Sequence, residues 1–271
     1  MENNIINATT SPDLANAAVT QALTEPVVQK EPAKLTSPFD TLVTLPGGLL
    51  LPTGEVLKTA EVRELTGKDE EAIGKVVGLG RILNTIINRA VVKIGDKPVT
   101  ESMLDSLLSG DRDTLVLGIY KATFGNTAQF NSYCEGCNDT KVVEVNIDED
   151  VKIKTLLDPI GDRTFTVKGR NSEYLVTLPT GITQKELSTN IDKTSAELST
   201  MLLEQTVLEI DGTSVYGKTQ ILNLGVMDRQ TIAEEIVKRN PGPQLNDISV
   251  ICPNCNGKVV VPITIGALFR F

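Results

Sequence analysis

Four cysteines are the residues of this chain whose type and spacing could do chemistry. They form two CxxC motifs and are Cys134, Cys137, Cys252 and Cys255. A CxxC turn places two thiolates where they can chelate one metal ion, and structural zinc takes four such ligands in a tetrahedron. Because the chain contains no histidine, we expect all four thiolates to converge on one structural Zn²⁺. The fold must then bring together two motifs that are distant in sequence.

The positions of the two motifs bear on what the thiols do. A redox CxxC motif sits at the start of a helix that follows a strand, whereas both motifs here precede strand formers, at residues 141–145 and 258–261. The first residues, Met1 to Asn4, lack the basic and apolar regions of a signal peptide. We therefore expect synthesis in a reducing cytoplasm, where paired cysteines are more often metal ligands than disulfides. Redox motifs and inert buried thiols are the alternatives to zinc.

Composition argues against several classes of function. The 271-residue chain is 40% hydrophobic, enough for a substantial core, and has a formal net charge of −9. Phosphate binding needs clustered Lys and Arg, so the charge disfavours a zinc-ribbon regulator that binds nucleic acid. No stretch approaches the roughly 20 apolar residues of a spanning helix. We expect neither nucleic-acid binding nor a membrane span.

The sequence offers little for catalysis. The commonest general base is missing because there is no histidine. The acidic cluster Asp69-Glu70-Glu71 stands where a helix start favours acids. Residues 74–80 are glycine-rich but lack the Gly-Lys-Ser/Thr ending of a phosphate loop. A four-thiolate zinc site is also closed to an activated water, so we expect no enzyme.

Patterning predicts an α+β fold. Residues 40–45 and 58–65 alternate as strands do. Thr66 has the character of a helix cap, with an acid three residues later. A hairpin at 91–99 and a helix at 112–124 then lead to the first CxxC motif.

Landmarks of the first half recur in the second half in the same order. The matched segments are 43–48 with 176–181, 66–69 with 183–186, 91–99 with 207–215, 111–115 with 228–232, and 134–137 with 252–255. The offset is 116 residues from Val91 to Val207 and 118 from Cys134 to Cys252, but 133 at the first strand. This recurrence predicts two related tandem repeats that pack about a pseudo-twofold axis, as homodimers do. Equivalent CxxC turns would meet near that axis and share one zinc.

We therefore expect three parts. Residues 1–37 would form a flexible, extended N-terminal arm, because they contain few large apolar side chains. Residues 38–160 would be the first repeat and residues 161–271 the second. The arm is either a disordered tail or a segment that orders against a neighbouring subunit.

The C-terminus has residue types that are enriched at interfaces. They are Phe269, Arg270 and Phe271. They serve either as interface anchors or as the end of a last strand whose phenylalanines pack on the core, and the sequence leaves both readings open.

Two stretches of the first repeat carry a recognisable pattern. They are Ser37-Pro38-Phe39 followed by Val43-Thr44-Leu45-Pro46-Gly47-Gly48, and Val62-Arg63-Glu64-Leu65-Thr66-Gly67-Lys68-Asp69-Glu70-Glu71. This pattern resembles the baseplate hub or hub-assembly proteins of T-even-like contractile-tailed bacteriophages. The similarity covers roughly residues 37–145 and ends at the first CxxC motif. The second repeat matches only in outline, and Val62-Arg63 has no clear counterpart there.

The resemblance implies a non-enzymatic role in building the tail baseplate, with the four cysteines as zinc ligands and no catalytic residues. We expect a zinc-stabilised structural or assembly component of the hub region, located in the virion after synthesis in the host bacterial cytoplasm. Its partners would be other tail and baseplate proteins, reached through the arm and the C-terminal aromatic residues. A tail-assembly chaperone absent from the mature virion is the first alternative, and the nucleic-acid-binding zinc ribbon is the second.

Overall fold

The computed structural model describes residues 12–13, 16, 41–245, 248–261 and 263–269. Residues 1–36 and 37–271 are separate compact units, and only the second is described in detail. The predicted arm, Arg270 and Phe271 lie outside the described residues, apart from three positions of the arm. The expectations for them stay predictions.

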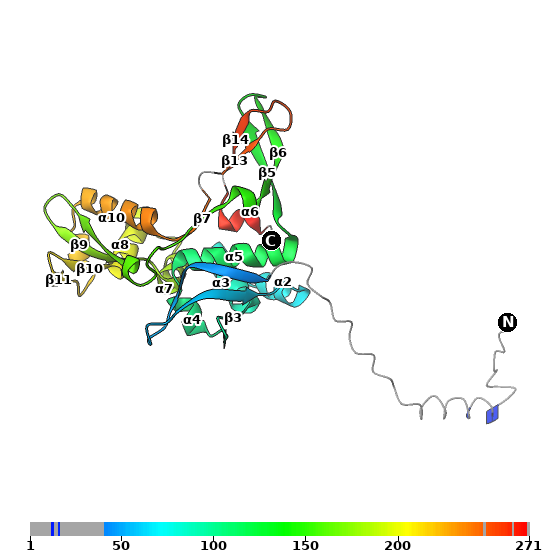
Figure 1. Ribbon diagram of the computed structural model, residues 1–271, viewed down its shortest axis with the longest axis horizontal. Helices are drawn as coiled ribbons and strands as arrows, with labels where there is room; N and C mark the ends of the chain where they lie inside the picture. Colours follow the sequence, from blue (N-terminus) through cyan, green and yellow to red (C-terminus); the bar gives the residue numbers. More distant parts are fainter. Residues whose placement is uncertain (1–11, 14–15, 17–40, 246–247, 262, 270–271) are drawn as a thin grey trace. The chain divides into compact units, whose positions relative to one another are not determined.

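The first half of the described chain is built on a four-stranded antiparallel sheet covered by helices (Figure 1). The sheet order is β1-β2-β3-β4, with bounds β1 Leu42–Leu50, β2 Val56–Val62, β3 Val91–Ile94 and β4 Lys97–Pro98. Its helices are α2 Gly67–Ile73, α3 Leu79–Ala90, α4 Glu101–Ser106 and α5 Ser109–Phe124. Helix α5 packs on β1 and is buried along most of its length. An apolar helix of this kind belongs in a core.

The second half repeats the order of these elements. The sheet order is β11-β10-β9-β8, with bounds β8 Thr164–Lys168, β9 Glu173–Thr177, β10 Val207–Ile210 and β11 Thr213–Ser214. Its helices are α7 Gly181–Thr189, α8 Ser195–Thr206, α9 Lys218–Leu222 and α10 Val226–Arg239. Two helices follow the second strand of each sheet and two follow the fourth. The predicted mixture of helices and sheets is confirmed.

Each half is followed by a two-stranded hairpin. The first hairpin is β5 Thr127–Cys134 with β6 Asp139–Asn146, and the second is β13 Ser249–Ile251 with β14 Lys258–Val260. The remaining elements are α6 Ile147–Asp150, β7 Lys152–Lys154, the 3₁₀ turn Gly161–Arg163, β12 Gly242–Gln244 and α11 Ile265–Leu268. Strand β12 pairs with β7, so the chain returns from the second half to the first before it forms the second hairpin.

Two local expectations were wrong. The capping box of α7 is formed by Thr180 and Thr183, not by residues 183–186. Strand β9 is the second strand of its sheet, so residues 176–181 occupy the place of the end of β2 and not of β1. The odd offset of 133 residues came from this mismatch.

The buried side chains form two clusters. One is centred on α3 and α5, and it includes Val259, Val261 and Phe269 from the C-terminal segment. The other is formed by β8 to β10 with α8 to α10. Phe269 is 7% exposed, and its ring centroid lies 5.7 Å from that of Tyr120. Because it is buried, Phe269 contributes to the core, although the residues before it, 265–268, form a helix and not a last strand.

The Pro-Gly-Gly segment of the sequence pattern forms a bend within β1 that requires glycine. The pairing of β1 with β2 shifts register there, and Gly48 has φ of +73°, which favours glycine. Oδ1 of Asp111 accepts hydrogen bonds from the N–H groups of Gly47 and Gly48 at 2.7 and 3.3 Å. Arg163 donates to their carbonyls at 3.1 and 2.5 Å. A Cβ on Gly47 would lie 2.6 Å from Leu108 Cδ1.

The second stretch of the pattern forms a charged cluster at the start of α2. The Asp69 side chain is 1% exposed and lies 2.7 Å from both Arg63 Nη1 and Arg89 Nε. It also accepts a 2.9 Å hydrogen bond from the backbone N–H of Thr66, the helix N-cap. The Arg63 guanidinium, helped by Thr66 and Arg89, holds the pKa of Asp69 well below its usual range. This cluster fixes α2 to its own half.

Candidate metal centre

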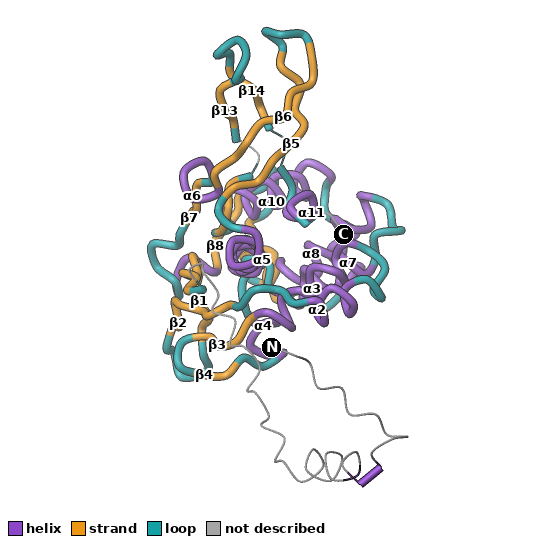
Figure 2. Tube along the Cα trace, turned by 90° about the vertical axis from the view of Figure 1, so that its right-hand side faces the viewer, coloured by secondary structure: helices purple, strands orange, loops and turns teal. Residues whose placement is uncertain are grey.

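The two CxxC motifs lie at the turns of the two hairpins, which pack side by side (Figures 1 and 2). Cys134 ends β5, and Cys252 directly follows β13. Strand β14 packs on β5 and β13 on β6. Each hairpin therefore brings one CxxC turn to the same end of the paired structure.

The four sulfur atoms form one cluster. All Sγ atoms lie within 4.8 Å of one another. The Cys134–Cys255 separation is 3.5 Å and the Cys137–Cys252 separation is 3.7 Å, whereas a disulfide would be about 2.05 Å. A zinc ion with Zn–S bonds of about 2.3 Å in a tetrahedron holds its sulfurs roughly 3.8 Å apart. The spacing suits a shared tetrahedral ion.

The two turns have the same local geometry. Asn138 has φ of +53° and Asn256 has φ of +56°, the left-handed region that Asn tolerates better than most residues. Each follows the second cysteine of its motif, so both motifs read CxxCN. In the second turn, the Asn256 N–H donates to the Cys252 carbonyl at 3.0 Å. This shared asparagine is a signal in the sequence that our reading of it missed.

Space and electrostatics at the cluster favour a cation. A Cβ on Gly136 would lie 3.0 Å from Cys255 Sγ, so glycine lets the turns approach closely. The backbone N–H groups of Asn254 and Cys255 lower the pKa of the Cys252 thiol. The Cys255 sulfur and burial raise the pKa of the Cys137 thiol. Thiolates this close repel one another unless a cation lies between them.

Basic side chains near the cluster are fewer than expected. Lys141 interacts favourably with Cys137 and Cys252, but its ammonium is paired with Asp139 at 2.7 Å. The hydrogen bond that Lys141 donates to Asp139 is the largest cause of the raised pKa of Lys141. Lys258, which the sequence suggested as a second compensating charge, is exposed. Protein cations therefore offset only a small part of the charge of four thiolates.

The cluster stands alone in the described part of the chain. No other group of three or more Cys, Asp or Glu side chains there is arranged to hold a metal ion. Within the same ranges, no helix combines the length and apolarity that crossing a bilayer requires.

Comparison with protein families agrees with the pattern in the sequence. The family described as T4 bacteriophage base plate protein matches residues 51–270, which is most of the chain. The chain belongs to this family. The match extends the similarity through the second half and over both CxxC motifs, beyond the first repeat that carried the resemblance. Searches of curated proteins and of solved structures found no match.

Membership in the T4 base plate family confirms the predicted kinship with T4-like phage baseplate proteins. It indicates a place in the virion tail, among other phage tail proteins. The structure brings together all four residues predicted as ligands. Their role as zinc ligands is taken up as a proposal below.

Proposed function

We propose that this protein is a structural component of the phage baseplate, in its hub region, and that one Zn²⁺ holds its two hairpins together. The ligands would be Cys134, Cys137, Cys252 and Cys255. The observation that carries the proposal is the convergence of four thiols from two distant hairpins within 4.8 Å. Such a site is closed, so its zinc would stabilise the fold and would not activate water.

The proposal includes a duplication of one structural unit. In support, the pairing of β2 with β3 slips by one residue at the same step as the pairing of β9 with β10. The β3–β4 and β10–β11 hairpins also turn through a residue with positive φ at the same place, Gly95 in one and Asp211 in the other. Shared irregularities of this kind support common origin better than shared element order does.

A buried arginine at the start of α5 and its counterpart in α10 make matching contacts. Each donates through Nη1 to a carbonyl of the preceding short helix and through Nη2 to a polar side chain of the helix before that one. The acceptors are Leu104 and Asn84 for Arg112, and Ile221 and Thr200 for Arg229.

The preceding aspartates also correspond. Asp111 accepts backbone hydrogen bonds at the β1 bend from Gly47 and Gly48. Asp228 accepts one at 2.9 Å from Arg170, in the loop between β8 and β9. Each aspartate thus ties α5 or α10 to the first strand region of its half, at the bend within β1 or in the loop after β8. These pairs support the repeats at 38–160 and 161–271, although the second hairpin packs with the first core.

The hairpins support a local pseudo-twofold axis through the proposed zinc. Cys134 corresponds to Cys252, and Cys137 corresponds to Cys255. Exchanging the two copies turns the Cys134–Cys255 contact into the Cys252–Cys137 contact, and the two distances are 3.5 and 3.7 Å. The helical bodies do not support the same axis, because α7 packs against α3 with no comparable packing of α2 against α8 among the described residues.

The metal is tested by elemental analysis of the full chain purified without added chelator. We expect one zinc per chain, and no zinc in Cys134→Ser or Cys252→Ser. Glu135→Gln is the matched control, because Glu135 is exposed in the same turn and offers no thiol. Wild-type protein that contains no zinc after refolding with excess Zn²⁺ would contradict the clamp.

The structural role is tested by locating the protein. We expect it in purified virions, in the tail baseplate, and without enzymatic activity. Detection only in infected cells would instead identify a tail-assembly chaperone. Tight binding to nucleic acid at low salt would favour the zinc-ribbon regulator, which the net charge of −9 disfavours.

A further inference from the structure

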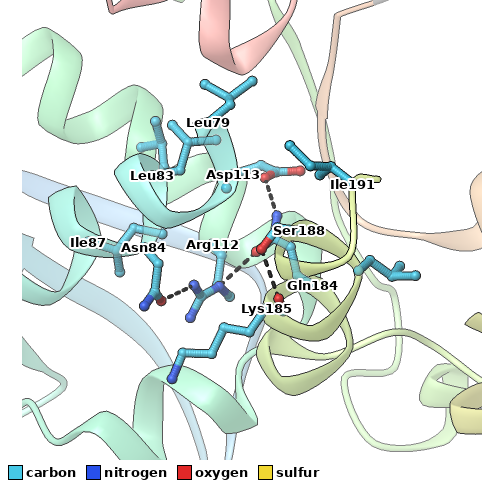
Figure 3. A pocket seen from close by; sticks show the side chains of 13 residues that line it. Leu79, Leu83, Asn84, Ile87, Arg112, Asp113, Gln184, Lys185, Ser188 and Ile191 are labelled. Atoms are coloured by element: carbon cyan, nitrogen blue, oxygen red, sulfur yellow. Dashed lines mark hydrogen bonds between the residues drawn. The ribbon is translucent and has the colours of Figure 1, made fainter. Parts of the chain in front are cut away.

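Helix α7 of the second half lies in a groove on the first half. This first groove lies between α3 and α5 and includes Gly80, Leu83, Asn84, Arg112, Asp113 and Val116. Helix α7 forms its third wall, and a cavity of about 380 Å³ remains between the three helices. Figure 3 shows Gln184 between Arg112 and Asp113, with Lys185 and Ser188 on the same helix. Helix α7 thereby joins the two halves within one chain.

Polar contacts define how α7 sits in the first groove. Arg112 Nε donates to Gln184 Oε1 at 2.7 Å, and Gln184 Nε2 donates to Asp113 Oδ1 at 2.9 Å (Figure 3). Lys185 forms ion pairs with Glu101 and Asp105 of α4 at 2.9 and 2.7 Å. The groove therefore presents an arginine, an acid beside it, and two acids on α4.

A close backbone approach completes the contact. A Cβ on Gly80 would lie 2.0 Å from the Cβ of Ser188, so α3 and α7 touch where the groove has no side chain. Helices approach this closely only where one of them carries a very small residue. The pair of Gly80 with Ser188 fixes the position of α7 along the groove.

The second half has the corresponding groove between α8 and α10. This second groove forms a depression of about 620 Å³ whose lining includes Ala196, Ser199, Thr200, Arg229, Gln230 and Ala233. Each of these residues holds the position of one lining residue of the first groove, counted from the start of its helix. Val226, at the rim, is 79% exposed. No helix of the described chain occupies this groove.

The second groove contains a hydrogen-bond donor that has no partner among the described residues. Arg229 donates from Nη1 and Nη2 to its own half. Its Nε, the atom that binds Gln184 in the first groove, has no partner among the described residues. Lys218, at the start of α9, stands at the place of Glu101 and forms no ion pair within those residues. It interacts favourably at longer range with Glu197, which lines the groove at the start of α8 and is itself engaged by the Thr194 cap.

We propose that the second groove binds helix α2 of a second copy of this chain. Helix α2 holds in the first half the place that α7 holds in the second, because both follow the second strand of a sheet and begin after a threonine cap, Thr66 or Thr180. Glu70 and Glu71 on α2, and Gly74 directly after it, are exposed, and Val77 is 83% exposed.

Charge complementarity selects α2 as the occupant. Counted from the caps, Glu71 stands at the place of Lys185, and it would meet Lys218 where Lys185 meets Glu101. Both members of this ion pair are thus reversed together, whereas the place of Asp105, the second partner of Lys185, is held by the neutral Leu222. Glu70 stands at the place of Gln184, and its carboxylate would accept from Arg229 Nε.

The residue after Arg229 also differs from its counterpart in the first groove. Gln230 stands at the place of Asp113, where the first groove accepts a hydrogen bond from an amide. Nε2 of Gln230 donates to Glu234 at 3.1 Å, and its second N–H can donate to the carboxylate of Glu70. An acid there would instead repel it. The second groove therefore suits an acidic helix, and the first groove suits an amide.

The close-approach residues are exchanged in the same way. Gly74 stands at the place of Ser188, and Ala196 stands at the place of Gly80. One glycine remains at the crossing in either case, contributed by the groove in the first contact and by the helix in the second. Leu83 and Val116 are replaced by Ser199 and Ala233, which leaves more room in the second groove.

The resulting contact is heterologous, because each copy contributes its second groove to one neighbour and its α2 to another. Such contacts close into rings or extend as helical arrays. The inference rests on the duplication in the proposed function but not on the zinc. The zinc analysis and the virion assay would stand if self-assembly failed, and self-assembly would stand if the chain bound no zinc.

The test is a charge exchange in the full-length, metal-replete chain, with mass followed by sedimentation over micromolar to millimolar concentrations. We expect the wild type to self-associate, Glu71→Lys or Lys218→Glu to weaken association at least tenfold, and the double variant to regain most of it. Glu149→Lys is the control, because it makes the same charge change on the exposed face of α6 and should leave association unchanged.

A wild type that stays monomeric throughout this range would overturn the inference. So would association that neither single variant weakens, or single variants whose effects the double variant does not reverse. Circular dichroism of each variant separates loss of contact from loss of fold.

Cysteine cross-linking provides a positional readout. We expect mild oxidation to join Gly74→Cys chains to Ala196→Cys chains when the two are mixed, because these positions meet at the proposed helix crossing. A mixture of Gly74→Cys with Glu149→Cys should give no such product. Equal yields from the two mixtures would contradict the proposed register.

Discussion

Helices α2 and α7 occupy the same place in the two halves but are held there by different means. The start of α2 is fixed by the buried Asp69, which binds Arg63 and Arg89 within its own half. The second half has neutral side chains at these places: Thr183, Thr177 and Gln205. Helix α7 is held instead by the first groove, through Gln184 and Lys185.

The difference separates framework contacts from docking contacts. The aspartate and arginine at the start of α5 and α10 keep the same kinds of partner in both halves, because they tie each helix to other elements of its own half. Residues on the outer faces of α2 and α7 differ in charge because they meet different surroundings. A helix that no other element covers needs an internal clamp, and Asp69 provides it.

The largest effect is expected from loss of a ligand thiol. Cys134→Ser or Cys252→Ser should each loosen both hairpins, because the proposed zinc would be shared by both. Structural zinc contributes on the order of 10 kcal/mol in small modules, so the hairpins should lose nearly all protection. Hydrogen exchange at β5–β6 and β13–β14 measures this. Full protection of one hairpin in either variant would mean that the two motifs do not share a metal.

The two buried arginines should differ in their contribution to stability. Arg112 is 2% exposed, and Arg112→Met would leave its acceptors in α3, α4 and α7 without a donor. Each unsatisfied buried group costs about 1–3 kcal/mol, so we expect a loss of roughly 3 kcal/mol. Arg229→Met, at a half-buried site with an open groove, should cost about 1 kcal/mol. Urea unfolding measures both, and equal losses would argue that the two grooves are equally closed.

The Asp69 cluster gives a prediction in pH. The pKa of the Asp69 carboxyl is lowered in the folded state, chiefly by Arg63. The unfolded chain therefore binds more protons, and the free energy of unfolding rises with pH. The contribution is full above the unfolded pKa of about 3.9 and is lost as pH falls towards the folded pKa. Asp69→Asn should therefore cost about 2 kcal/mol at pH 7 and progressively less below pH 4.

The control for this prediction is the corresponding site in the second half. Thr183→Asn changes a neutral side chain, so its effect on the free energy of unfolding should not depend on pH. If the cost of Asp69→Asn stayed constant down to pH 2, the carboxylate would not be the group that the two arginines stabilise.

Much of this architecture follows from local sequence. Turn residues, caps and alternating apolar positions indicated the β3–β4 hairpin, helix α5 and the convergence of the cysteines. The recurrence of landmarks was noted, but the segment at the end of β9 was matched to β1 because Val-Thr-Leu-Pro occurs at both 43–46 and 176–179. In fact Pro46 enters a bend within β1, whereas Pro179 precedes the cap of α7. Only strand pairing distinguishes these contexts.

The grooves were not predictable in the same way. They depend on which helix packs against which, and nothing local to α7 indicates that it lies on α3. The Asp-Arg pairs at 111–112 and 228–229 were noticed as landmarks. The side chains that accept from Arg112 Nη2 and Arg229 Nη2, however, lie at least 28 residues earlier in the sequence, on other helices. The reversed charges at 71 and 218 gain meaning only once Lys185 and Glu101 are seen to touch.

The smallest expected effect on folding is that of Gly67→Ala. Nothing lies within 4 Å of a Cβ at Gly67, whereas a Cβ at Gly181, the same position in α7, would lie 2.5 Å from the Leu104 carbonyl oxygen. Gly181→Ala should therefore cost about 1–3 kcal/mol, and Gly67→Ala should stay within about 0.5 kcal/mol of the wild type. If α2 docks on a second copy, the methyl group of Gly67→Ala would press on the Ile221 carbonyl there. Unfolding would then be unchanged while sedimentation shows weaker association, and a variant that associates normally would place α2 outside the second groove.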